Sequence, residues 1–155
     1  MRLAIITCSD TRSLAEDEAG HALAKRITAR KWELCQHMVV KDDMQTIEAR
    51  LKHCSDALKA DVILTCGGTG LSSRDVTPEA TLAVADRVVP GISEAIRQAS
   101  LDITKCAMLS RAVSVQRGTT LIINLPGSKN AALECLYVCI DQLEHAADMM
   151  AGKGH

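Results

Sequence analysis

A glycine-rich run placed directly after a short apolar segment constrains the fold of this chain more than any other feature. Residues 62–66 (VILTC) are apolar and β-rich, which is typical of a parallel strand buried on both faces. Glycines follow in 67–70 (GGTG), and the chain then favours a helix start, with Thr77 as N-cap and Pro78 at the first helical position. The run therefore predicts a strand, a tight loop whose N–H groups can approach an anion, and a helix.

This loop lacks the two best-known nucleotide-binding patterns. A Walker loop requires Gly-Lys followed by Ser or Thr, whereas Gly70 is followed by Leu71. The fingerprint G-x-G-x-x-G has Ser73 in place of its last glycine. Arg74 and Asp75 instead add a cation and a carboxylate just beyond the glycines. The loop predicts a different kind of anion site, and the alternative is a structural turn that binds nothing.

The composition excludes several classes of protein. The 155 residues predict one domain over 1–155, and a net charge of −1 with no Lys/Arg run argues against nucleic-acid or membrane-surface partners. Trp32 and Tyr137 are the only aromatic residues, too few for the stacking platforms of single-strand binders. Seven cysteines without C-x-x-C spacing and a start without a signal peptide predict reduced thiols and a cytoplasmic protein.

The apolar pattern predicts strands that alternate with helices. The expected strands are 3–8, 32–40 and 62–66, with a hairpin of 110–116 and 119–125 that turns at Arg117-Gly118. The expected helices are 14–29, a helix capped by Asp42-Asp43 that runs to about 58, 81–85, 92–103 and 130–150. This alternation predicts a three-layer α/β fold, with a mostly parallel sheet and helices on both faces.

Polar clusters follow each of the predicted parallel strands. Residues 9–11 (SDT) end the first strand, Asp42 follows the second, 67–75 follow the third, and 127–128 (GS) end the last. Parallel strands have their carboxyl ends at one edge of the sheet, which is where ligands bind in open α/β sheets. The four clusters are therefore expected to form one site.

These residues resemble the molybdenum-cofactor biosynthesis family, most closely its molybdopterin adenylyltransferases and the G domains of two-domain cofactor proteins such as gephyrin. The resemblance spans roughly 3–151 and is carried by 7–11 (TCSDT), 39–43 (VVKDD), 67–70 (GGTG), 74–80 (RDVTPEA), 108–111 (MLSR) and 122–128 (IINLPGS). It implies the molybdopterin-binding fold and a homotrimer or a multiple of one. It also implies that the protein uses ATP and a divalent cation such as Mg²⁺ to adenylylate the terminal phosphate of molybdopterin, releasing pyrophosphate.

The resemblance also implies roles for particular residues. Asp42 and Asp75 match two aspartates that the family needs for its chemistry, and we expect them to hold Mg²⁺ and orient the phosphates. The substrate-binding residues that it implies are Ser9, Asp10, Thr11, Gly67, Gly68, Thr69, Gly70, Ser110, Gly127 and Ser128. A phosphate monoester is already anionic near neutral pH, so the reaction needs positioning and charge neutralisation more than a strong base.

Several of these residues also have an ordinary structural interpretation. The alternatives are a helix N-cap for Asp42 and for Ser128, an Asx turn for Asp10, a turn cap for Asp75, and surface ion pairs of little value for Arg74 and Arg111. The chain departs from the family pattern at Lys41 and Lys129, where relatives often have proline, and at 114–116 (SVQ), where an Ala-Gly stretch is usual. None of these departures removes an expected catalytic group.

The competing function is a non-catalytic carrier or scaffold that binds molybdopterin in the same fold. The presence of both Asp42 and Asp75 favours the enzyme. A role in molybdate insertion is less favoured, because we expect none of the additional domains that such proteins carry in this family.

Overall fold

The computed structural model describes residues 1–153, so the last two residues of the expected 1–155 domain lie outside the described part. One six-stranded sheet has the order β2-β1-β3-β6-β5-β4. Its strands are β1 (Arg2–Cys8), β2 (Glu33–Val40), β3 (Val62–Cys66), β4 (Arg87–Val88), β5 (Ser114–Arg117) and β6 (Thr120–Leu125). The first four strands in this order are parallel, and β6, β5 and β4 pair antiparallel.

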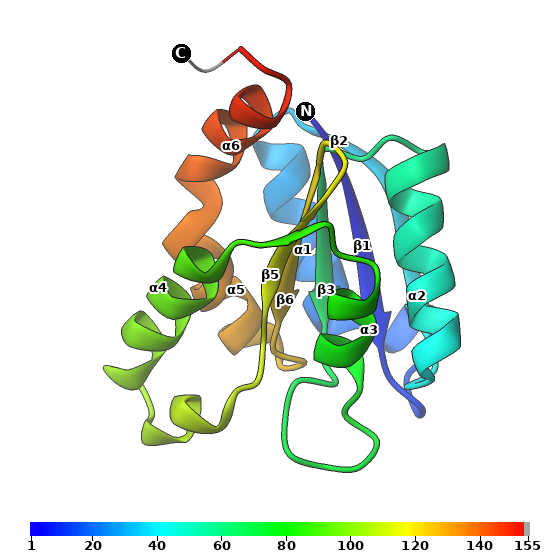
Figure 1. Ribbon diagram of the computed structural model, residues 1–155. Coiled ribbons are helices and arrows are strands. Elements are labelled where there is room, and N and C mark those ends of the chain that lie inside the picture. Colours follow the sequence, from blue (N-terminus) through cyan, green and yellow to red (C-terminus); the bar gives the residue numbers. More distant parts are fainter. Residues whose placement is uncertain (154–155) are drawn as a thin grey trace.

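Helices cover both faces of the sheet (Figure 1). One face carries α1 (Glu18–Ala29), α4 (Pro90–Leu101), α5 (Lys129–Cys139) and α6 (Leu143–Met150). The opposite face carries α2 (Met44–Lys52) and α3 (Thr77–Ala83). The predicted three-layer, mostly parallel α/β fold is confirmed.

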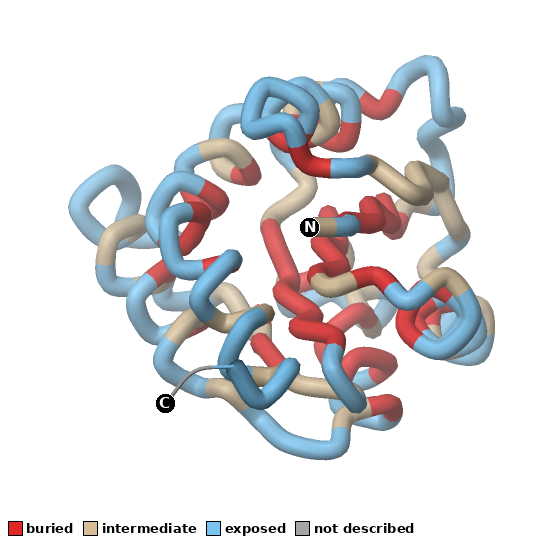
Figure 2. The backbone as a smooth tube through the Cα atoms, turned by 90° about the horizontal axis from the view of Figure 1, so that it is seen from above, coloured by how far each residue is buried: buried red, intermediate tan, exposed pale blue. Residues whose placement is uncertain are grey.

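Alternate side chains of each central strand enter different cores. Leu3 and Ile5 of β1 belong to the core under α1 and α5, whereas Ala4 and Ile6 belong to the core under α2 and α3. Figure 2 shows the resulting band of buried residues along the strands and the inner sides of the helices. Burial on both faces explains why the strands are continuous apolar runs rather than alternating ones.

The predicted long helices are interrupted in the structure. The helix predicted over 14–29 starts as a 3₁₀ turn, η1 (Leu14–Glu16), and restarts at α1 because the Asp17 carboxylate caps the Gly20 N–H. The helix expected to run to about 58 ends in a π-helical turn, η2 (His53–Ala57). The helix predicted over 130–150 is divided by η4 (Ile140–Gln142). Apolar spacing continues through that break into one core, so the pattern could not reveal it.

The strand predicted over 110–116 begins only at Ser114. Residues before it form the 3₁₀ helix η3 (Lys105–Leu109) and an irregular segment. The N–H of Arg111 donates to the Thr69 carbonyl at 2.9 Å instead of pairing with a strand. This part of the chain is therefore attached to the glycine loop, and the short strand β4, which the pattern did not predict, fills the sheet edge beside β5.

The strand register places the predicted polar clusters at one edge. Thr7 of β1 is level with Val39 of β2 and Cys66 of β3, and Cys66 is level with Leu125 of β6. The segments that follow these residues emerge together, at the lower end of Figure 1 and opposite the chain's N-terminus.

The seven cysteines are free thiols, as predicted. Across residues 1–153, no helix has both the length and the apolar character required to cross a bilayer.

Candidate active site

A polar cavity of about 320 Å³ opens at the carboxyl ends of the parallel strands. Its lining residues are Cys8, Ser9, Arg12, Asp42, Gly67, Gly68, Thr69, Gly70, Asp75 and Gly127. Eight of the residues predicted from sequence therefore meet in one cavity. The other four, Asp10, Thr11, Ser110 and Ser128, do not line it.

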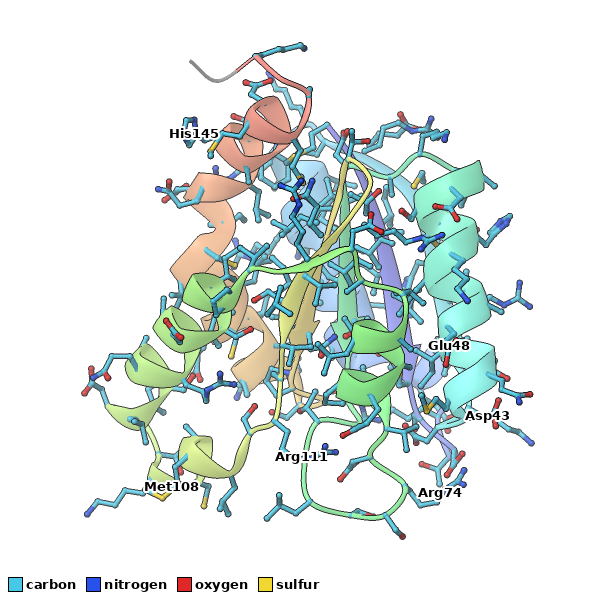
Figure 3. The ribbon with its side chains drawn as sticks, viewed as in Figure 1. Asp43, Glu48, Arg74, Met108, Arg111 and His145 are labelled. Carbon is cyan, nitrogen blue, oxygen red and sulfur yellow. The ribbon has the colours of Figure 1, made fainter. Side chains whose placement is uncertain are left out.

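Asp42 is not the N-cap of the helix that follows it. That position belongs to Asp43, whose Oδ2 accepts from the N–H of Thr46 at 2.8 Å, and Figure 3 shows Asp43 at the start of α2. Asp42 instead pairs with Asp10: its Oδ2 accepts from the Asp10 N–H at 3.0 Å, and Oδ1 of Asp10 accepts from its N–H at 3.1 Å. These two hydrogen bonds join the loops after β1 and β2 and fix Asp42 at the cavity.

The surroundings of Asp42 disfavour its negative charge. Burial raises the pKa of the Asp42 carboxyl, and the neighbouring charges of Asp10 and Asp75 raise it further. The Asp10 N–H and the Arg74 guanidinium oppose this rise only in part. A cation bound beside Asp42 would relieve the repulsion among these carboxylates.

Gly68 brings the loop against two unpartnered oxygens. It has a φ of +65°, and a Cβ built there would overlap Thr77 Oγ1 and lie 3.1 Å from Asp42 Oδ1. Both oxygens are buried and make no hydrogen bond within the described chain. Unpaired buried oxygens are rare and require an explanation, which here points to a ligand at the loop.

The predicted capping role of Thr77 is wrong. Helix α3 starts at Thr77, and its N-cap is Val76, which makes no side-chain cap. The N–H of Thr77 donates to the Gly68 carbonyl at 3.2 Å, so the residue joins the helix to the glycine loop. Its hydroxyl faces that loop instead of the helix end.

Asp75 lies against the same loop. Its Oδ2 accepts from the Ser72 N–H at 3.0 Å, so Asp75 caps the turn before α3, which is the structural role that the sequence offered as an alternative. A Cβ at Gly70 would lie 2.9 Å from this oxygen, which shows how close the carboxylate is to the backbone. Because Asp75 also lines the cavity, the turn cap and a ligand-facing role coexist.

Asp10 links two loops at the rim of the site. Nε and one terminal nitrogen of Arg74 donate to its two carboxylate oxygens at 2.9 and 3.0 Å. Figure 3 labels Arg74 on the loop after β3, so this pair connects that loop to the one after β1. With Asp42 and Arg74 as its partners, Asp10 shapes the site from outside the cavity.

Arg111 clamps the glycine loop and is not merely a surface ion pair. Its Nε donates to the Gly70 carbonyl at 2.7 Å and a terminal nitrogen donates to the Asp75 carbonyl at 2.6 Å. The other terminal nitrogen pairs with Glu79, and its hydrogen bond, aided by the arginine charge, lowers the pKa of that carboxyl. Figure 3 shows Arg111 beside the loop. The only sequence signal for this role was its place in the MLSR segment.

Arg12 lines the cavity and was not predicted. Its N–H and that of Thr11 donate to Ser9 Oγ at 3.2 and 3.3 Å, which turns the chain back over the sheet edge. A terminal nitrogen of Arg12 then donates to the Gly127 carbonyl at 2.8 Å. No sequence pattern marks this arginine, because only the turn brings it to the site.

The remaining two predicted residues line neighbouring cavities. Ser110 belongs to a mainly apolar cavity of about 460 Å³ between α4, η3, α5 and the glycine loop, which shares Thr69 and Gly70 with the polar cavity. Ser128 is the N-cap residue of α5 but makes no side-chain cap, and it lines a cavity of about 230 Å³ beside Arg12.

The fold and this site define an α/β protein with a polar cavity at the carboxyl ends of its parallel strands, the position at which open α/β sheets bind their ligands. The chain belongs to the family described as "probable molybdopterin binding domain", whose family model matches residues 4–145.

Known relatives agree with this assignment. The chain is 40% identical over 141 residues to a molybdopterin adenylyltransferase of Escherichia coli K12, covering 88% of this chain and 72% of that protein. It is 31% identical over 157 residues to a molybdopterin adenylyltransferase of Helicobacter pylori 26695, covering 99% and 89%. The solved structure of the molybdopterin biosynthesis enzyme MoaB from Thermus thermophilus has a TM-score of 0.89 and 39% identity, covering 98% and 97%.

Proposed function

We propose that this protein is a molybdopterin adenylyltransferase, which transfers the adenylyl group of ATP to the terminal phosphate of molybdopterin. The observation that carries the proposal is the meeting of Asp42 and Asp75 at one glycine loop in a polar cavity. The names of the E. coli and H. pylori relatives support the same activity.

The reaction exchanges one phosphate oxygen bond for another. An oxygen of the molybdopterin phosphate attacks the α-phosphorus of ATP, a new P–O bond forms, and the bond from that phosphorus to the bridging oxygen breaks. The bridging oxygen and its electron pair leave with pyrophosphate. Because the attacking phosphate is already ionised, no side chain has to remove a proton. Positioning by the glycine-loop N–H groups and by Ser9 is then the main contribution of the chain.

The residues present suit Mg²⁺. Within residues 1–153 no group of three or more His, Cys, Asp or Glu could form a metal cage made of protein alone. Mg²⁺ is usually held by one or two carboxylates together with substrate phosphates and waters. Asp42, with its unpartnered Oδ1, and Asp75 would supply those carboxylates. When bound, the ion neutralises the charge of the phosphates.

The apolar and polar cavities suit the two ends of molybdopterin. The apolar cavity offers a surface for the flat pterin ring and includes Ser110. Thr69 and Gly70 line both cavities, so a ligand with its ring in the apolar cavity can direct its phosphate toward Asp42 and Asp75. This arrangement gives Ser110 a substrate-binding role distinct from that of Ser9.

The carrier alternative predicts binding without chemistry. Both carboxylates are in place, so the enzyme is the better-supported function. The proposal includes a homotrimer that acts in the cytoplasm. The family resemblance supports the trimer, and so does the exposed apolar side chain of Met108 after α4, which a second copy could cover.

The direct test is to incubate the protein with molybdopterin, ATP and MgCl₂ and to measure adenylylated molybdopterin and pyrophosphate together. We expect Asp75→Asn to lower turnover by at least about 100-fold, in the range of other lost electrostatic contacts to a transition state, while molybdopterin still binds. Asp43→Asn is the matched control, because asparagine is an equally good N-cap and Asp43 does not line the cavity.

The outcomes separate the candidate functions. Product that depends on Asp75 and on the metal supports the adenylyltransferase. Molybdopterin binding without product in the parent protein supports the carrier. Turnover by Asp75→Asn at the parent rate contradicts the proposed role of Asp75.

A further inference from the structure

The polar cavity is poor in positive charge. Of the residues that line it, Asp42 and Asp75 are acidic and Arg12 alone is basic. A phosphate-bearing ligand in this cavity therefore faces two carboxylates and one guanidinium. Repulsion between anions is the main obstacle to bringing phosphates together, so the one cation in the lining has the charge that such a ligand requires.

The guanidinium of Arg12 is held in place and keeps most of its N–H donors available. Within the described chain its side chain makes one hydrogen bond, to the Gly127 carbonyl at 2.8 Å. Arginine has five N–H donors, so four remain for a ligand. Its backbone is fixed as well, because the Arg12 N–H donates to Ser9 Oγ at 3.2 Å. Fixing both ends lowers the entropy lost when a ligand binds.

The two other arginines near this edge, Arg74 and Arg111, already donate hydrogen bonds to groups of the protein. Two nitrogens of Arg74 donate to the carboxylate of Asp10. All three side-chain nitrogens of Arg111 have partners on the loop after β3 or on α3. Neither of these arginines lines the polar cavity. Arg12 is therefore the arginine at this edge that combines a ligand-facing position with spare donors.

Arg12 also stands between two cavities. It lines the polar cavity and the neighbouring cavity of about 230 Å³ that contains Ser128, Lys129, Glu16 and Glu18. The Glu16 carboxylate accepts hydrogen bonds from the Ser13 hydroxyl and the Ser13 N–H. A chain of phosphates longer than the polar cavity would pass Arg12 and approach Lys129, and it would also face the carboxylates of Glu16 and Glu18.

We propose that Arg12 binds a phosphate group of the substrate in the polar cavity. The proposal rests on the proposed function, and it adds a specific binding residue to it. The shared chemistry is a tetrahedral phosphate that accepts two parallel N–H donors from one guanidinium. The phosphate belongs either to the pyrophosphate part of the nucleotide or to molybdopterin.

Calorimetric titrations of the intact protein distinguish these two sources. Inorganic pyrophosphate with MgCl₂ and molybdopterin are titrated separately into the parent, Arg12→Gln, Arg12→Lys and Lys41→Gln. We expect Arg12→Gln to weaken one of the two ligands by about 10- to 100-fold, the range for a lost hydrogen bond to a charged group. Arg12→Lys should lose less, because it keeps the charge and loses the planar fork.

Lys41→Gln is the control for net charge. Lys41 lies at the same edge but lines none of the cavities described above, so its loss should change both affinities less than about twofold, as expected for a screened surface charge. Weaker pyrophosphate binding in Arg12→Gln assigns the nucleotide phosphates, and weaker molybdopterin binding assigns the acceptor phosphate.

Parent-like affinity of Arg12→Gln for both ligands overturns the proposal, as does equal weakening by Lys41→Gln. If Arg12→Gln does not fold, Arg12→Lys takes its place in the test. Weaker binding of one ligand by Arg12→Lys, with the salt dependence of the parent, supports the contact, and parent-like binding of both ligands that does not change at high salt contradicts it. The titrations measure binding and do not depend on turnover. A parent protein that is inactive in the adenylylation assay would contradict the proposed function, and the role of Arg12 in binding would still be tested.

Discussion

Two loops reach the same sheet edge and are held there by opposite means. The loop after β1 ends at Asp17, which has 0% exposure, and whose carboxylate accepts from Thr7 Oγ1 at 2.7 Å, His37 Nε2 at 2.8 Å and the Gly20 N–H at 3.0 Å. The loop after β3 has no buried anchor of this kind and is held mainly by the partly exposed Arg111.

The comparison separates stability from positioning. A buried carboxylate with every partner in place becomes costly when any of those partners is lost, so Asp17 should matter mostly for folding. Arg111 bonds backbone carbonyls near solvent, so it contributes less to stability and more to the shape of the loop that carries Asp75. Variants of Asp17 should therefore change mainly the free energy of unfolding, and variants of Arg111 should change mainly the activity.

The largest expected effect comes from Asp17→Ala. This change leaves Thr7, His37 and the Gly20 N–H without their acceptor and should lower the free energy of unfolding by about 3–5 kcal/mol in urea denaturation. The control is Asp141→Ala, which removes an exposed ion pair with Arg30 and should cost less than about 1 kcal/mol. Equal losses of unfolding free energy in the two variants would contradict the role of Asp17 as a buried anchor.

The same anchor predicts a dependence on pH. Burial alone would raise the pKa of Asp17, but hydrogen bonds from Thr7, His37 and Gly20 outweigh it and hold the pKa below its ordinary value. The stabilisation is therefore present above the unfolded-state pKa of about 3.9 and is lost as the pH falls through the lower folded-state value. The parent should lose more stability than Asp17→Ala when acidified through this range.

The next effect is expected at Gly68. Gly68→Ala places a β-carbon against Thr77 Oγ1, whereas Gly118→Ala has a similar φ of +54° and nothing within 4 Å. We expect Gly118→Ala to cost about 1–2 kcal/mol from backbone strain and Gly68→Ala about 2–4 kcal/mol from strain and crowding. Turnover should fall only in Gly68→Ala, because Asp42 Oδ1 also lies 3.1 Å from the added carbon.

A comparison of these two glycine variants by urea denaturation and by adenylylation assay tests both effects. If Gly118→Ala lost as much activity as Gly68→Ala, backbone strain in general would explain the result, and the contact between the loop and Asp42 would not. Adding Thr77→Ala to the Gly68→Ala protein should restore part of the lost stability.

The smallest effect on stability is expected for Arg111→Lys. A lysine ammonium cannot bridge the carbonyls of Gly70 and Asp75 as a planar guanidinium does. We expect a stability loss of about 1 kcal/mol, with kcat lowered by about 10-fold and KM little changed, as for a lost positioning contact. Glu79→Gln removes only the ion pair and should retain kcat. An equal loss of kcat in Glu79→Gln would mean that the ion pair, and not the contacts with the two carbonyls, explains the effect.

Much of the architecture could be predicted from sequence because it depends on local patterns. The run 62–66 is apolar since β3 is buried on both faces, and the glycines after it form the predicted loop. Because the parallel strands align their ends, Ser9, Asp42 and Gly127 meet as expected. The break between α5 and α6 was missed because apolar residues continue on one side through it.

Neighbouring residues of the same type could not be assigned from sequence. Asp42 and Asp43 are adjacent carboxylates, and either could cap a helix. Their roles differ only because Asp43 accepts from an N–H of α2 while Asp42 pairs with Asp10 across two loops. Thr77 was expected to cap α3, but its hydroxyl faces Gly68 in the folded chain.

The sequence by itself determined the layers of this protein, the edge of the sheet at which the polar cavity opens and the two carboxylates at that edge. Those properties follow from strand burial and from the common direction of parallel strands, which a one-dimensional pattern records. Only the tertiary structure decided that Arg12 lines the cavity and that Arg111 holds the loop after β3. Arg12 contacts Gly127, 115 positions away, and Arg111 contacts Gly70 and Asp75, 41 and 36 positions away. No local sequence pattern shows which distant backbone group a long side chain reaches in the folded chain.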